Sequence, residues 1–186
     1  MNKKSFLTAS TLALAISTAT TAVYSAELEE IIVTAQKRAE SLQDVPISMS
    51  ALSGSTIKDN GIHSFQDLSG YVPNLEIAEN AVNTIITMRG IGIGSNQSFE
   101  QSVGIYVDGV HFGKSRQVRS GLFDVEQVEV LRGPQGILFG KNTLAGAINV
   151  TTASANVGDE FSGGIDVSQE SYNGQIVDAH IAGSVT

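Results

Sequence analysis

The sequence is poor in several residue types, and each shortage excludes a class of chemistry. It contains no cysteine, so neither a disulfide nor a thiolate metal site nor a cysteine nucleophile is possible. Lysine and arginine number 11 against 19 acidic residues, and the formal net charge of −8 argues against a nucleic-acid partner, because phosphate binding needs clustered cations. Aromatic residues reach only 6% whereas glycine reaches 19 residues, which predicts a core interrupted by many turns.

Patterns of catalytic and metal-binding residues are missing as well. The three histidines, His63, His111 and His180, are far apart and form no pair with the spacing of metal ligands. No Gly-x-Ser-x-Gly nucleophile motif is present, and the acidic residues fall in turns or on charged strand faces. We therefore expect no enzymatic activity, no bound metal and no cofactor.

One glycine-rich stretch resembles a phosphate-binding loop. It is GPQGILFGKNTLAGAINV (Gly133–Val150). A Walker A loop needs glycine five positions before its Gly-Lys pair, and Gln135 stands there. It also needs serine or threonine after the lysine, where this sequence has Asn142 after Lys141. Both mismatches argue against a nucleotide, and the glycines are better explained by turns and close packing.

The N-terminus has the three parts of a secretory signal peptide. Lys3 and Lys4 precede an uncharged stretch, Phe6–Val23, and small residues up to Ala26 offer a cleavage site. The stretch is short and rich in threonine for a membrane anchor. Residues 1–26 are thus predicted to be removed, which changes the formal net charge from −8 to −10 because two lysines are lost.

Residues 27–44 form a charged tail around a short apolar segment, Ile31–Thr34. The segment is too short to bury much surface by itself, so one interpretation is a flexible terminus. The other is an extended peptide that adds a strand to the sheet edge of a partner, for which β-branched residues are well suited.

The next part of the chain predicts short strands, short helices and long loops. Alternation or apolar runs predict strands over Val45–Ala51, Thr84–Met88, Ser102–Val107, Val110–Phe112, Val125–Leu131 and Ala147–Thr152. Helices are predicted over Ser53–Asp59 and Ser64–Tyr71. In the second helix Ser64 and Asp67 have the spacing of a capping box, and Pro73 ends the pattern. Asp108-Gly109 predicts a hairpin turn between two of the strands.

The pattern changes after Asn156 to two amphipathic strands. Phe161–Ser168 and the stretch from Gly174 to Val185 alternate apolar and polar residues around the turn sequence Asn173-Gly174. This alternation is typical of a transmembrane β-barrel, although a hairpin on a soluble sheet has the same periodicity. Because an isolated hairpin is marginally stable, the pattern predicts a truncated barrel.

Four stretches together resemble the N-terminal part of TonB-dependent outer-membrane receptors. The resemblance is carried by EEIIVTAQKR, which is similar to a TonB box, by DVPISMSALSG with IHSFQDLSGYVPNL, by ITMRGIG with SVGIYVDGV, and by FDVEQVEVLRGPQGILFGKNTLAGAINVTT. The last three resemble the opening, middle and closing segments of the plug domain. The resemblance extends from about Glu29 to Thr152.

The resemblance implies a fold and a function. It implies an α+β plug domain, a small mixed sheet with short helices and long loops, over residues 45–153, followed by the first antiparallel strands of a truncated β-barrel over 154–186. In the family the plug fills a 22-stranded barrel of the outer membrane. The implied partners are the inner-membrane TonB complex and a scarce ligand such as a ferric siderophore. An isolated plug-like periplasmic binding module, or a non-transporting fragment, is the alternative.

Site residues follow from the resemblance by position. The TonB box corresponds to Ile31, Ile32, Val33, Thr34 and Ala35. Two plug arginines that pair with barrel acids in the family correspond to Arg89 and Arg132. Candidate ligand-facing loops contain Ser95, Asn96, Gln97, Lys114 and Arg116. Packing and turn positions are Gly90, Gly133, Pro134, Gly136, Gly140 and Asn142, and Ile137, Leu138 and Phe139 are expected to supply buried area.

Overall fold

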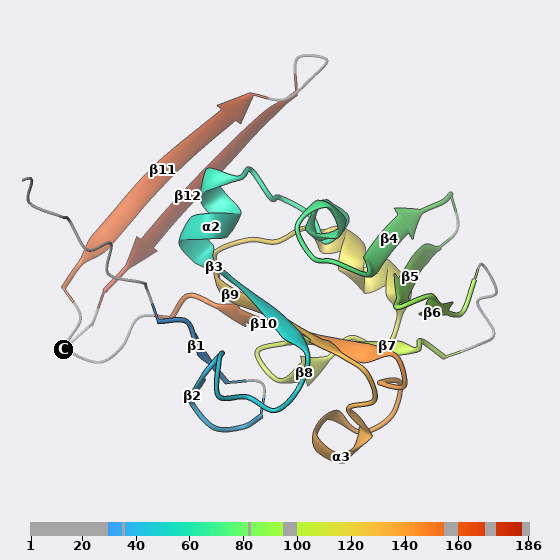
Figure 1. The fold of residues 1–186 in the computed structure, drawn as a ribbon. Coiled ribbons are helices and arrows are strands. Elements are labelled where there is room, and N and C mark those ends of the chain that lie inside the picture. The colour runs from blue at the N-terminus through green and yellow to red at the C-terminus, as the bar shows by residue number, and fades with distance from the viewer. Residues whose placement is uncertain are drawn as a thin grey trace, which may run out of the picture.

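A mixed five-stranded sheet lies at the centre of the computed structural model, which describes residues 30–34, 36–81, 83–94, 100–154, 160–169 and 174–183 (Figure 1). Its strands, in spatial order, are β3 (Met49–Ser53), β9 (Val125–Arg132), β10 (Gly146–Thr152), β7 (Val103–Val107) and β8 (Val110–His111). The β10–β7 pair is parallel and the other pairs are antiparallel. The predicted α+β plug with a mixed sheet is confirmed; the predicted signal peptide lies outside the described residues.

The remaining elements are short, apart from the last two strands. A second sheet contains β4 (Leu75–Glu79), β5 (Thr84–Met88) and β6 (Ile91–Gly92), and two hairpins are formed by β1 (Ile32–Val33) with β2 (Glu40–Ser41) and by β11 (Ser162–Gln169) with β12 (Gln175–Ala182). The helices are α2 (Gly54–Asp59), α3 (Gly136–Phe139) and the 3₁₀ helices η1 (Asp67–Gly70) and η2 (Ser115–Ser120). In the described part of the chain, no helix has the length and apolar character needed to cross a bilayer.

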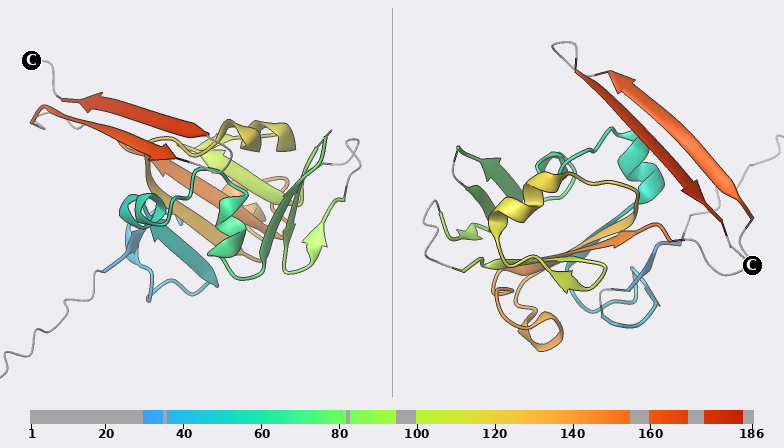
Figure 2. Two further views of the ribbon diagram at one scale, coloured as in Figure 1. Left: turned by 90° about the horizontal axis from the view of Figure 1, so that it is seen from above. Right: turned by 180° about the vertical axis from the view of Figure 1, so that it is seen from behind.

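The main core lies on one face of the central sheet. Successive residues of a strand point to opposite faces, so Val128 and Val130 of β9 share one face. Both pack in a cluster with Ile105 and Ile148 from the neighbouring strands and with Leu68 of η1, and all five side chains are fully buried. Figure 2 shows α2 and the β4–β6 sheet on this side of the central sheet.

The opposite face of the sheet is covered by the N-terminal tail. Gln127, Glu129 and Leu131 of β9 alternate with the core residues and therefore point to this second face. Leu131 is fully buried, and Val33 of β1 is 1% exposed. The tail is thus part of the folded domain and not only a flexible terminus.

The predicted hairpin at Asp108-Gly109 is present between β7 and β8. Both turn residues have positive φ, 49° at Asp108 and 78° at Gly109, which is the backbone of a type I′ turn. The Asp108 carboxylate accepts hydrogen bonds from the amide and the hydroxyl of Thr152, at 2.9 and 2.8 Å. These bonds join the hairpin to the end of β10.

The predicted helix over Ser64–Tyr71 is shorter in the structure, where only the 3₁₀ helix η1 forms. Its capping residues behave as expected, since Ser64 N donates to Asp67 Oδ2 at 2.8 Å and Asp67 N donates to Ser64 Oγ at 3.3 Å. A segment of this length gains little from helical hydrogen bonds alone, so the packing of buried Phe65 determines its conformation.

Three elements of the middle region were not predicted or begin elsewhere. Strand β4 alternates buried Leu75 and Ile77 with exposed residues and pairs with β5. The 3₁₀ helix η2 forms in the segment with Lys114 and Arg116, where a ligand-facing loop was expected. Strand β3 begins at Met49 and not at Val45, because Pro46 has no amide hydrogen to donate to a sheet.

Candidate functional site

The segment Ile31–Thr34 forms strand β1 and its flanks, and its two backbone edges face different neighbours. Leu42 N donates to Ile31 O at 2.9 Å, and Val33 is paired with Glu40 of β2. Because the N–H and C=O groups of one residue point to the same side and alternate along a strand, Ile31 and Val33 face β2. Ile32 and Thr34 therefore face away from β2. Ala35 lies outside the described residues.

The edge formed by Ile32 and Thr34 is bonded to side chains of β9. Gln127 Nε2 donates to Ile32 O at 2.9 Å, and Thr34 N donates to Glu129 Oε1 at 2.5 Å. The Glu129 side chain is fully buried, and its second oxygen accepts from Asn149 Nδ2 of β10 at 2.8 Å. Sequence reasoning missed Gln127 and Glu129, because their partners are 95 residues away in the chain.

The two predicted ion-pair arginines lie close together. A Cβ added at Gly133 would be 3.8 Å from Arg89 Nη1, and Arg132 is the next residue to Gly133. Burial lowers the pKa of Arg132, and the positive charge of Arg89 lowers this pKa further. Within the described ranges no carboxylate lies within ion-pair distance of either guanidinium.

Neutral groups hold the Arg132 guanidinium in place. Nε donates to Pro73 O at 3.1 Å, and Nη1 donates to Ser48 Oγ at 3.3 Å. Nη2 donates to Ser50 Oγ. None of these acceptors carries a charge, so the Arg132 guanidinium is held in place with its positive charge uncompensated among the described residues.

The predicted turn and packing positions are of two kinds, those with positive φ and those without. Positive φ angles occur at Gly90 (77°), Gly133 (96°), Gly140 (79°) and Asn142 (66°), a backbone that glycine and asparagine adopt most easily. Pro134 lies between β9 and α3. Gly136 has no neighbour within 4 Å of an added Cβ. Close packing is therefore not what requires glycine at position 136.

The expectation of buried area at Ile137, Leu138 and Phe139 is wrong for the first two residues and holds in part for Phe139. Ile137 is 100% exposed, and Leu138 is exposed as well. Phe139 is half-buried against Tyr106, with a ring-centroid distance of 4.8 Å. Burial raises the pKa of Tyr106, whose hydroxyl donates to Phe139 O. Ile137 and Leu138 are exposed because α3 projects from the sheet in a separate loop (Figure 1).

The candidate ligand-facing loops are described only in part. Ser95, Asn96 and Gln97 lie outside the described residues, whereas Lys114 and Arg116 are exposed at the start of η2. A residue that sequence reasoning did not single out, Arg119, lies in the last turn of the same helix.

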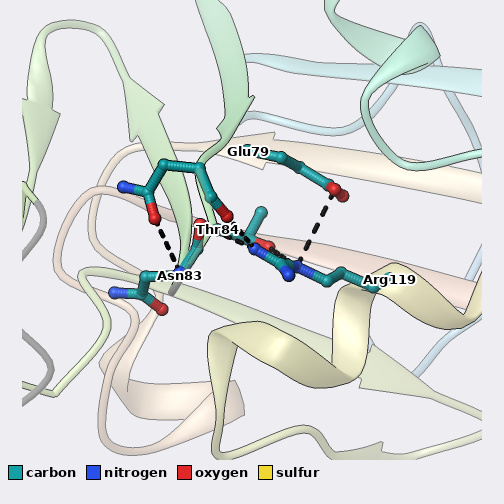
Figure 3. A network of polar contacts seen from close by, with 5 residues as sticks. Glu79, Asn83, Thr84 and Arg119 are labelled. Carbon is teal, nitrogen blue, oxygen red and sulfur yellow. Dashed lines mark hydrogen bonds and ion pairs between the residues drawn. The ribbon is translucent and has the colours of Figure 1, made fainter.

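Arg119 joins η2 to the β4–β5 turn (Figure 3). Its Nε donates to Thr84 Oγ1 at 3.1 Å, and its Nη2 donates to the backbone oxygens of Asn80 and Asn83 at 2.5 and 2.9 Å. The Glu79 carboxylate lies 3.7 Å from Nε. The Arg119 guanidinium is thus paired within the fold, and it holds the β4–β5 turn beside η2.

Substitution of Arg119 by alanine is expected to loosen the β4–β5 turn, because the buried part of this network loses its donors. We expect local opening to become easier by about 2 kcal/mol. Hydrogen exchange at residues 79–84 measures this change, and Arg116→Ala, which removes an exposed cation of the same helix, is the control. Unchanged exchange at these residues would contradict the bracing role.

One cavity lies away from all predicted site residues. It has a volume of about 340 Å³ between α2 and the β11–β12 hairpin, and its lining includes Lys58, His63, Asp178 and His180. No set of three His, Asp or Glu side chains with metal-binding geometry occurs among the described residues.

Comparison of the sequence with known proteins matches the chain to one family of receptors. Residues 41–147 match the model of the TonB-dependent Receptor Plug Domain family. The Pesticin receptor of Yersinia pestis is 32% identical over 167 residues, which are 84% of this chain and 24% of the receptor. The Vitamin B12 transporter BtuB of Vibrio vulnificus is 29% identical over 68% of the chain and 21% of its own length.

The solved structures that match include outer-membrane receptors. The ferric yersiniabactin uptake receptor FyuA from Yersinia pestis matches with a TM-score of 0.62 and 32% identity, over 69% of this chain and 20% of that one. The ferripyoverdine receptor of Pseudomonas aeruginosa has a TM-score of 0.69 at 18% identity, over 84% and 20%, which shows the shared fold. The chain spans about a quarter or less of the length of these relatives.

Proposed function

The chain belongs to the TonB-dependent receptor plug domain family, and from this premise we propose that it is the plug portion of a receptor for energy-coupled uptake across the outer membrane. The receptor's cargo in this proposal is a scarce ligand of the ferric siderophore class. The ferric yersiniabactin uptake receptor FyuA and the catecholate siderophore receptor Fiu, both similar to this chain, support that class. The single observation that carries the proposal is the match of residues 41–147 to the plug.

The partner of the N-terminal tail is the periplasmic domain of TonB. Residues Ile31–Ala35 act as the TonB box and pair as an extended strand with a sheet edge of TonB. The β conformation of Ile32 and Val33 supports this role, because strand addition relies on backbone hydrogen bonds of an extended peptide. Ile32 keeps 46% of its side chain exposed, so part of the segment is already accessible.

The arginines Arg89 and Arg132 bind acidic residues of the surrounding barrel wall. The two arginines lie close together, and the partners of Arg132 are neutral. No carboxylate among the described residues pairs with either cation. This arrangement supports the assignment, because two adjacent unpaired cations favour an external anion. Release of such pairs accompanies movement of the plug during uptake. Ser95–Gln97, Lys114 and Arg116 face the ligand.

The β11–β12 hairpin supplies the first strands of the barrel. Ile165, Val167, Val177 and Ile181 lie on one face in register, and all four are exposed. A continuous apolar strand face that the plug does not cover fits contact with lipid. Export to the outer membrane begins with the signal peptide of residues 1–26.

Retention on immobilised TonB periplasmic domain tests the proposed function. The purified chain is expected to bind with micromolar affinity, the range of weak peptide-mediated contacts. A synthetic peptide of residues 29–38 is expected to compete with it, because that peptide carries the TonB box. Retention equal to bare resin, or binding that the peptide does not reduce, would contradict the role of the tail.

A further inference from the structure

Both backbone edges of strand β1 carry hydrogen bonds in this conformation. Its Ile31 and Val33 side is paired with β2, and its Ile32 and Thr34 side is bonded to Gln127 and Glu129. A partner that adds a strand to β1 must use one of these two sides. The β2 side can open only if the hairpin comes apart, whereas the other side is held by two side chains.

The two side chains imitate a neighbouring strand. Gln127 and Glu129 are two residues apart on β9 and therefore point to the same face of the sheet. Gln127 offers a donor to Ile32 O and Glu129 offers an acceptor to Thr34 N, which are the two bond types that a backbone ladder would supply. An open cavity of about 400 Å³, lined in part by Thr34 and Asn149, lies beside this edge.

We propose that Gln127 and Glu129 form a side-chain latch that occupies the edge of β1 formed by Ile32 and Thr34, and that TonB pairs with this edge only after the latch opens. The inference rests on the proposed function, since it specifies which edge of the tail the TonB strand takes. The β1–β2 pairing persists in the bound state, so the hairpin moves as a unit.

The latch closes because Glu129 is fixed independently of the tail. Its side chain is fully buried, and Asn149 donates to its other oxygen, so the acceptor for Thr34 N is already oriented. A hydrogen bond to a buried carboxylate is stronger than one between neutral groups. The closed state therefore dominates, and the apparent affinity for a strand partner is reduced by the fraction of molecules that are open.

Binding of the TonB periplasmic domain to variants of the full chain tests the latch. Glu129→Gln and Gln127→Ala are each expected to bind about tenfold more tightly than the parent, because each removes or weakens one latch bond. Glu126→Gln is the matched control, since Glu126 is an exposed residue of the same strand on the opposite face. Gln127 is half-buried, so Gln127→Ala is expected to keep the core intact. This variant therefore tests the latch even if Glu129→Gln disturbs folding.

Hydrogen exchange of the Thr34 amide tests the latch without any partner. We expect exchange about tenfold faster in Glu129→Gln than in the parent or in Glu126→Gln. Equal exchange in all three, or latch variants that bind TonB no more tightly than the parent, overturns the latch. Absence of TonB binding by every variant, with faster Thr34 exchange in Glu129→Gln, contradicts the proposed function and leaves the latch as a contact that holds the tail.

Discussion

Replacement of Gly146 by alanine is expected to lower the free energy of unfolding by about 3 kcal/mol, the upper part of the range for overpacking. A Cβ at this position would lie 2.2 Å from Met88 Sδ and 2.3 Å from Leu131 O. The Leu131 oxygen belongs to the backbone of β9, which is paired with β10 and with β3, and Met88 is fully buried. Neither neighbour can move away without disturbing the sheet or the core.

Urea unfolding followed by circular dichroism measures this loss. Gly70→Ala is the matched control, because Gly70 has no neighbour within 4 Å of an added Cβ and no positive φ. Its stability is expected to remain within about 0.5 kcal/mol of the parent, as for surface substitutions in general. If the two variants unfolded at the same urea concentration, the contacts inferred at Gly146 would be wrong.

The contrast among the glycines shows what a sequence can reveal about packing. The motif GPQGILFGKNTLAGAINV indicates many turns, and positive φ at Gly133, Gly140 and Asn142 agrees with that interpretation. It does not indicate which glycine meets a neighbour. Close packing was expected at Gly136, where the space is open, while the crowded position is Gly146. Its main neighbour, Met88, comes from a different sheet, so no local pattern identifies the contact.

Several strands, and the helix α2, form near the predicted residues, whereas the second predicted helix does not form in full. The alternation of side chains between the two faces of a sheet leaves a clear pattern in β5, β9 and the β11–β12 hairpin, all of which form near the predicted residues. The segment Ser64–Tyr71 has the caps and the apolar spacing of a helix, yet only η1 forms. In so short a segment tertiary packing outweighs local preference.

The location of the tail follows from contacts that sequence spacing cannot indicate. An extended peptide was one of two interpretations of the apolar segment Ile31–Thr34, and β1 is extended. Its docking depends on Gln127 and Glu129, 95 residues away, which look in the sequence like part of an ordinary charged strand face. A fully buried Glu129 between two polar partners is visible only after folding.

Proline at position 32 is expected to weaken binding of the chain to the TonB periplasmic domain by about 100-fold, which corresponds to about 3 kcal/mol. Proline removes the backbone N–H of Ile32, which points away from β2 toward the edge that the partner strand would use. Pairing within the β1–β2 hairpin relies on Ile31 and Val33, so the fold is expected to keep its circular dichroism spectrum.

Alanine at the same position separates backbone from side-chain effects. Ile32→Ala keeps the N–H, and because the parent side chain is 46% exposed, we expect its affinity to stay within about fivefold of the parent. Titration of both variants with the TonB domain gives the two dissociation constants. If Ile32→Pro bound as tightly as the parent, strand addition along the edge formed by Ile32 and Thr34 would be ruled out. If both variants lost affinity equally, the isoleucine side chain would carry the contact, and the tail would then be recognised through a side-chain pocket and not through its backbone.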